Sequence, residues 1–354
     1  MKTFVKIFSL TFLIIGVLTA ENDREKRYLD TAIKYYNEGN YKKAEKECRR
    51  IIKINPNNAE SHYLLGKIFF VTKRYKEAEK ELKEALKIEP NFAEAHNALG
   101  LLLETILGKY EEAEEEYREA IRINPELVEA RINLGSLLAQ SKRYEEAEKE
   151  LKEAIKINPN EPKAHNNLGF LFLLLDMYEE AEQEFREAIK LDPEHSVARS
   201  NLGYVLFLLK QYEQAEKELR VAIKIDPNDA GAYNNLGLLL WNLERYDEAE
   251  KKLKKAVKLD PKNVIMRNNL GYLLLYKQKK YKEAEKEFKK VIEIDPNYAP
   301  AYVNLGVLYI ETKKKSKAKE KILKARELFD KQGDYEGVNY CDELLKSIME
   351  EKNE

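Results

Sequence analysis

The hydrophobic pattern of the chain alternates between apolar stretches and highly charged ones. Residues 166–175, NNLGFLFLLL, would suit a membrane, yet they lie mid-chain in a protein in which 35% of the residues are charged. Glu, Lys, Leu and Ala are abundant and Gly and Pro are sparse, a composition that favours helices. No segment has the two-residue period of a strand, so the pattern predicts an all-α protein.

The pattern recurs with a period of 34 or 35 residues. Eight prolines share this spacing: Pro56, Pro90, Pro125, Pro159, Pro193, Pro227, Pro261 and Pro296. Before Pro90, for example, stand Gly66 and the Tyr-x-x-Ala pair of Tyr75 and Ala78. Small residues let two antiparallel helices approach closely, and a proline ends the second helix. Each period therefore predicts one helix–turn–helix repeat.

These residues resemble the tetratricopeptide repeat family over about residues 25–330. The resemblance implies a right-handed α-solenoid, a superhelix of about nine repeats with a C-terminal capping helix. We expect residues 1–20 to be a signal peptide or N-terminal anchor and residues 21–58 to hold N-terminal helices with a degenerate repeat. Seven regular repeats should fill residues 59–298, and a degenerate repeat and the capping helix residues 299–354. Terminal repeats face water on one side, which explains their departures from the pattern.

The repeats also predict polar contacts. With Ala59 as position 1 of its repeat, position 4 holds His, Arg or Tyr where the family usually has Trp, so packing there should be more polar. In eight repeats a Glu precedes a Lys or Arg by four residues, an orientation worth roughly 0.2–0.5 kcal/mol per pair. Two repeats have one extra residue, which we expect in the inter-helix turns near Gly108 and Gln278.

The first helix of a repeat has two distinct faces. At 100° per residue, positions 4, 7, 8 and 11 cluster on one side and positions 2, 6, 9 and 13 on the other. The first set should pack the repeats together. The family resemblance implies that the second set, flanked by positions 5 and 12, faces the concave ligand groove. The run at 166–175 is therefore expected to be apolar on both faces.

Position 6 of the groove face is Asn in six successive repeats: Asn133, Asn167, Asn201, Asn235, Asn269 and Asn304. An Asn amide can bind the N–H and C=O of a peptide together, so such a column suits an extended peptide. It resembles the ladder in the peptide-reading arm of O-linked N-acetylglucosamine transferases, although their catalytic domain is missing here. Alternatively, these amides satisfy local polar groups.

The groove floor is apolar and aromatic in repeats five to eight. Its candidate contacts are Phe170, Tyr204, Phe207, Leu238, Trp241 and Tyr272. At position 12, Leu173 and Leu275 are expected to deepen the floor together with Phe207 and Trp241. Exposed aromatic side chains in one patch are typical of interaction sites. The occupant stays open: a partner peptide, a second copy of the chain, or its own terminus.

Other functions find little support in the sequence. The 62 basic and 63 acidic residues are interspersed, which argues against binding to nucleic acid or an acidic membrane surface. No phosphate-binding Gly loop, zinc-protease helix, nucleophile elbow or Cys-x-x-Cys pair is present. Cys48 and Cys341 are expected to be buried thiols, and His62 and His96 are expected to be packing residues and not metal ligands. We expect no enzyme activity, no cofactor and no metal.

We expect a non-enzymatic protein–protein interaction scaffold. A self-associating solenoid, hence a homo-oligomer, and the accessory arm of an envelope glycosyltransferase encoded elsewhere are the alternatives. Lys2 and Lys6 precede the apolar stretch Ile7–Leu18, which indicates a secretory signal peptide or an uncleaved anchor. Either places the remaining chain outside the cytoplasm, in a periplasmic, envelope-associated or extracellular location, with membrane contact only through that segment.

Overall fold

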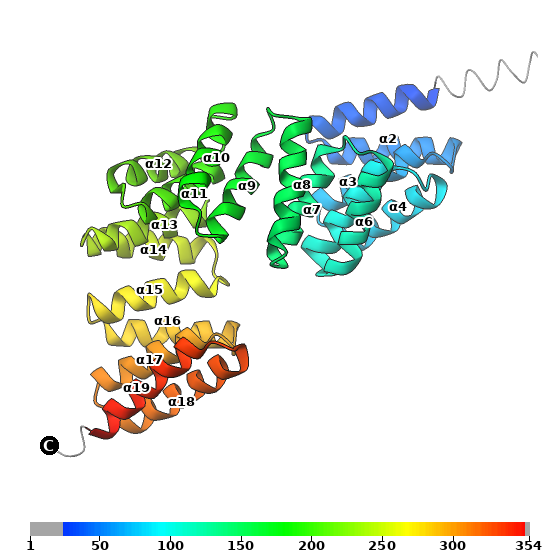
Figure 1. The fold of residues 1–354 in the computed structure, drawn as a ribbon. Helices are drawn as coiled ribbons and strands as arrows, with labels where there is room; N and C mark the ends of the chain where they lie inside the picture. The colour runs from blue at the N-terminus through cyan, green and yellow to red at the C-terminus, as the bar shows by residue number, and fades with distance from the viewer. Residues whose placement is uncertain (1–23, 351–354) are drawn as a thin grey trace, which may run out of the picture. The chain divides into compact units, whose positions relative to one another are not determined.

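The structure, a computed structural model, describes residues 24–350, and all of its regular elements there are helical (Figure 1). The expected signal peptide or anchor lies outside these residues. The helices cover residues 24–37, α2 (Tyr41–Ile54), α3 (Ala59–Val71), α4 (Tyr75–Ile88), α5 (Ala93–Leu102), η1 (Leu103–Leu107), α6 (Tyr110–Ile123), α7 (Val128–Gln140), α8 (Tyr144–Ile157), α9 (Pro162–Leu174), α10 (Tyr178–Leu191), α11 (Ser196–Leu208), α12 (Tyr212–Ile225), α13 (Ala230–Asn242), α14 (Tyr246–Leu259), α15 (Val264–Tyr276), α16 (Tyr281–Ile294), α17 (Ala299–Glu311), α18 (Lys315–Gln332) and α19 (Tyr335–Glu350).

The chain divides within α9 into two compact halves, one ending at Leu171 and the other beginning at Phe172. We call them the N-terminal half and the C-terminal half and describe each by itself. In both, consecutive helices pack against one another. First helices of neighbouring repeats also touch, in the series α3, α5, α7 and in the series α11, α13, α15, α17. This confirms the predicted all-α repeat solenoid, with α19 packed on α18 as its last helix.

The repeat glycines lie where two helices approach most closely. A Cβ atom on Gly66 would lie 2.6 Å from Cγ of Leu82, and one on Gly271 would lie 2.6 Å from Cε1 of Phe288. Leu82 and Phe288 are buried on the facing second helices. The pairing of a glycine with a large side chain therefore sets the helix spacing within a repeat.

The two extra residues are accommodated differently. The one near Gln278 lies in the turn between α15 and α16, as predicted. The one near Gly108 was expected in a turn, but the structure corrects this: the last turn of the first helix is the π-helical segment η1. This segment ends at Leu107 and is capped by Gly108, whose φ is 64°. A π-helical turn absorbs one additional residue without breaking the helix.

Position 4 forms a polar clamp in several repeats, which confirms the predicted polar packing. Arg131 donates from Nη1 to Glu150 at 2.6 Å and from Nε to the Pro125 carbonyl at 3.1 Å. The side chain thus joins the closing turn of one repeat to the second helix of the next. Equivalent clamps are made by His62, His96, Arg199 and Arg267.

The eight predicted Glu-to-base pairs all form, with N···O distances of 2.5–2.8 Å. A second base, which was not predicted from the sequence, reaches some of these carboxylates from the following repeat. Glu114 is 2.7 Å from Nη1 of Arg143, and Glu216 is 2.8 Å from Nη1 of Arg245. The charged second helices therefore also link neighbouring repeats.

The cysteines are free and buried, as predicted. Burial raises the pKa of the Cys48 thiol to about 12 and that of Cys341 to about 11. Neither thiol has the low pKa of a nucleophile. Over residues 24–350, none of the helices combines the length and the apolar character needed to cross a membrane.

Candidate peptide-binding groove

A cavity of about 370 Å³ lies on the first-helix side of the C-terminal half. The first helices α11 and α13 supply four predicted site residues to it, because a 3.6-residue period places their side chains on one face. These residues are Tyr204, Phe207, Leu238 and Trp241. The structure thus brings together the predicted apolar floor of two neighbouring repeats.

Polar and charged groups that were not predicted from the sequence complete the cavity. Its remaining lining residues are Asn242, Glu244, Tyr246 and Lys277. The ammonium of Lys277 lies 5.4 Å from the ring centroid of Tyr246, a cation–π distance. An apolar floor with a few polar groups at its edge is typical of a ligand-binding pocket.

Aromatic contacts extend the floor along the groove face. The rings of Tyr204 and Phe207 have centroids 6.2 Å apart, and those of Trp241 and Tyr272 lie 5.1 Å apart. The Tyr272 ring in turn lies 4.2 Å from Tyr276, whose pKa is raised, chiefly by burial. Phe207, Trp241 and Tyr272 are half-buried, so part of each side chain remains accessible to solvent.

The position-6 asparagines make contacts between repeats. Nδ2 of Asn269 donates to Oδ1 of Asn234, at position 5 of the preceding repeat, at 3.0 Å. The same link joins Asn133 to Asn97 and Asn304 to Asn268. Each of these hydrogen bonds uses one of the two N–H donors of the position-6 amide. The Oδ1 acceptor of the same amide takes no part in the bond. The ladder therefore helps to hold the repeats together and keeps groups that could bind a peptide.

Other members of the ladder differ in their partners. Nδ2 of Asn235 lies 3.4 Å from Oγ of Ser200 and 3.5 Å from its carbonyl oxygen. Oδ1 of Asn167 accepts a hydrogen bond from the neighbouring Asn166 at 3.1 Å. Asn201 lies half-buried on α11. In three repeats the position-6 Asn directly follows an Asn at position 5, in the pairs 166–167, 234–235 and 268–269. These Asn-Asn pairs were the sequence signal that position 5 could also take part in hydrogen bonds between repeats.

The predicted site residues are divided between the two halves. Asn133, Asn167 and Phe170 belong to the N-terminal half, where Phe170 is 43% exposed. The other nine belong to the C-terminal half. Leu275 was expected to deepen the floor, but it is 2% exposed and belongs to the core. We therefore take the cavity around Trp241 as the candidate groove.

No arrangement in the described part of the chain suggests metal chemistry. Between residues 24 and 350, no three His, Cys, Asp or Glu side chains form a group that could hold a metal ion. His62 and His96 act in the position-4 clamps instead.

Comparison with protein families gives matches along most of the chain. Two models described as tetratricopeptide repeat match it. One matches residues 35–102, 106–168, 172–237 and 275–337, and the other matches residues 234–299. A search of curated proteins finds no match.

Solved structures share the fold at low sequence identity. A chain of the APC/C hetero-tetramer Cut9–Hcn1 has a TM-score of 0.65 at 16% identity, and the match covers 86% of this chain and 59% of that one. A repeat protein from Parabacteroides merdae gives 0.56 at 20% identity, covering 71% and 99% of the two chains. PilF of Pseudomonas aeruginosa gives 0.53 at 23%, covering 62% and 97%. At these identities the likeness concerns the fold alone.

Proposed function

The chain belongs to the tetratricopeptide repeat family, and on this basis we propose that it is a non-enzymatic scaffold that binds an extended segment of a partner protein in the groove around Trp241. Members of the family are typically non-catalytic interaction proteins, which agrees with the absence of catalytic motifs in the sequence. The proposal concerns the class of ligand and the surface that binds it.

The observation that carries the proposal is the aromatic cavity. Phe207 and Trp241 line a hollow of about 370 Å³ and are only half-buried. A ligand side chain that enters this hollow removes apolar surface from water, at roughly 25 cal/mol per Å² buried. Aromatic anchors in a concave site commonly provide most of the binding energy of an interface.

The amide of Asn269 suits the backbone of such a ligand. It lies on α15, as does Tyr272, which contacts Trp241. Its Oδ1 can accept from a peptide N–H while its second Nδ2–H donates to a carbonyl. Backbone recognition of this kind is independent of ligand sequence, so the cavity would supply the selectivity.

We also propose that the scaffold works outside the cytoplasm. The support is the N-terminal sequence, in which two lysines precede a short apolar stretch. A cleaved signal peptide would release the protein, and an uncleaved one would tether it to the membrane.

The only Trp in the chain is Trp241, so its fluorescence reports directly on the groove. We would isolate partners from the envelope fraction of the native host with the wild type and with Phe207→Ala. The matched control is Leu323→Ala, an exposed apolar side chain on α18. Circular dichroism would check that all three proteins fold equally.

Two results together would support the groove. The wild type and Leu323→Ala should retain a partner that Phe207→Ala loses, and the purified partner should change the emission of Trp241 on titration. A partner that binds all three proteins equally would place the binding surface elsewhere. If the wild type instead forms dimers that Phe207→Ala abolishes, the groove holds a second copy of the chain and the partner proposal fails.

A further inference from the structure

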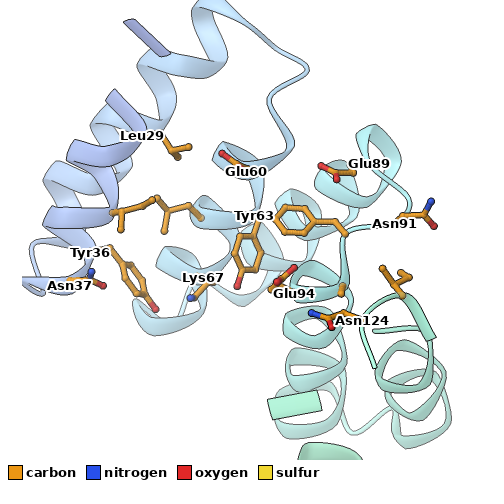
Figure 2. A pocket seen from close by; sticks show the side chains of 15 residues that line it. Leu29, Tyr36, Asn37, Glu60, Tyr63, Lys67, Glu89, Asn91, Glu94 and Asn124 are labelled. Atoms are coloured by element: carbon orange, nitrogen blue, oxygen red, sulfur yellow. The ribbon is translucent and has the colours of Figure 1, made fainter. Parts of the chain in front are cut away.

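A second cavity, of about 610 Å³, lies in the N-terminal half and was not predicted from the sequence. The helix over residues 24–37, α3 and the start of α5 enclose it (Figure 2). Much of its lining is apolar or aromatic, including Leu29, Ile33, Tyr36, Tyr63 and Phe92. Like the groove around Trp241, it offers an apolar surface that a ligand side chain could cover.

A lysine of the chain already occupies the space between two of the rings. Nζ of Lys67 lies 5.1 Å from the ring centroid of Tyr36 and 5.3 Å from that of Tyr63, and Figure 2 shows it between them. These are attractive cation–π distances. The Tyr63 ring also packs on Phe92, with centroids 4.9 Å apart. The cavity therefore holds a cation against its aromatic wall.

Three carboxylates line the same cavity. Glu60, Glu89 and Glu94 are exposed and line the cavity, as Figure 2 shows. None of the three makes an ion pair or a side-chain hydrogen bond with another residue of the described part of the chain. In contrast, the second helices pair a Glu with Lys or Arg in repeat after repeat. Three carboxylates against one ammonium leave a formal charge of −2 on the lining.

We propose that this cavity is a second binding site, which takes a partner segment that combines an apolar side chain with adjacent Lys or Arg residues. The apolar side chain would cover the rings, and the cations would pair with the glutamates that have no basic partner in the chain. An acidic segment would be repelled by the three carboxylates. A purely apolar segment would cover them without compensating their charge.

Defined peptides test this preference. Fluorescein-labelled Gly-Ser-Lys-Phe-Lys-Ser-Gly, blocked at both ends, would be titrated with the full chain and followed by fluorescence anisotropy. It should bind at least about tenfold more tightly than a peptide with Glu in place of both lysines or one with Gly in place of Phe. Added salt should weaken the binding, because the carboxylates lie near solvent.

Three variants of the protein sharpen the test. Glu60→Gln combined with Glu94→Gln should weaken binding of the basic peptide about tenfold. Lys67→Met should tighten it about threefold, because it removes a competing cation. The control Glu145→Gln, an exposed Glu on α8, should leave binding unchanged. Equal binding of the basic and acidic peptides, or unchanged binding by the double variant, would overturn the proposal.

The emission of Trp241 distinguishes this site from the groove in the C-terminal half. The basic peptide should leave that emission unchanged and should bind Phe207→Ala as it binds the wild type. If instead it shifts the emission and loses affinity for Phe207→Ala, the peptide binds in the groove and the second site fails. A dimer that dissociates in the double Gln variant, with no peptide binding, would assign the cavity to a second copy of the chain and also overturn the proposal.

Discussion

The N-terminal and C-terminal halves share one scaffold but present different surfaces and different polar links. The N-terminal half has a cavity surrounded by carboxylates, and two of its position-4 clamps use His. The C-terminal half has a more aromatic cavity that includes Lys277, and its clamps use Arg. In both, a glycine faces a large buried side chain. The fold therefore restricts which residues can stand at the packing positions. The halves differ instead in the side chains that line their cavities and in the residue at position 4.

The largest expected effect tests whether the shared core stabilises each half locally. Phe288→Ala in the C-terminal half and Leu151→Ala in the N-terminal half remove fully buried side chains. Each should lower the free energy of unfolding by about 2–5 kcal/mol, through lost burial and a residual cavity. Because each repeat contacts only its neighbours, amide hydrogen exchange should accelerate mainly around the altered repeat.

Equal acceleration of exchange along the whole chain in both variants would contradict this local view. It would mean that the chain unfolds as one cooperative unit and that the core of each half does not stabilise that half locally.

The second effect is a dependence of stability on pH, which we expect in the N-terminal half and not in the C-terminal half. The pKa of His62 is raised above 6.5, first by its hydrogen bond to Glu81 and further by the Pro56 carbonyl. Burial opposes the charge on His96, but Glu116 and the Pro90 carbonyl outweigh it, so the pKa of His96 is also raised. Both partners of each ring can only accept, so the clamp is complete when the imidazole is protonated.

The sign of the pH dependence follows. A His whose pKa is higher in the folded state stabilises the fold fully below its unfolded pKa of 6.5 and loses that contribution as the pH rises through its folded pKa. Each clamp should contribute about 1–2 kcal/mol. Urea unfolding across this range should therefore show loss of stability on the alkaline side, with the accelerated exchange confined to the N-terminal half.

Exchanging the clamp residues tests this directly. His62→Arg should remove part of the pH dependence from the N-terminal half, and Arg199→His should introduce one in the C-terminal half, because Arg remains charged throughout the range. The clamp interpretation fails if His62→Arg leaves the pH dependence of the N-terminal half undiminished, or if Arg199→His introduces none in the C-terminal half.

Features that depend on spacing within a repeat could be predicted from the sequence. The helix pairs, the close approach at Gly66 and the pair of Glu79 and Lys83 follow from the helical period. The turn with its additional residue at Gln278 was also predicted. The π-helical end at Gly108 was not, because a turn and a widened helix accommodate one residue equally well at the level of sequence.

Contacts between repeats were harder to predict. The hydrogen bond from Asn269 to Asn234 and the ion pair of Glu216 with Arg245 join positions whose proximity depends on how helices stack. The apolar floor around Trp241 was predicted, since it uses one helix face per repeat. The cavity beside Lys67 was not, because it combines side chains of three repeats.

A smaller effect on stability is expected from the turns between the two helices of a repeat, and it should be the same in both halves. Lys142 and Lys210 occupy matching turns with φ of 60°, a left-handed conformation that is unfavourable for residues with a side chain. Replacing either by Gly should stabilise the protein by about 0.5 kcal/mol, since the relief of strain exceeds the entropy that Gly loses. Thermal unfolding would measure it. Destabilisation by Gly at either position would show that the lysine side chain makes a compensating contribution.

The smallest effect should also be equal in the two halves, and it tests whether their shared ion pairs are interchangeable. Arg143→Gln removes the base that joins Glu114 to the next repeat, and Arg245→Gln does the same at Glu216. Both arginines are partly exposed, so each substitution should cost only about 0.2–0.4 kcal/mol, at the low end for exposed ion pairs, with less effect at high salt. Chemical denaturation at low and high salt would measure both. An effect in one half alone would mean that the halves differ in their charged outer helices too, and not only on the inner face and at position 4.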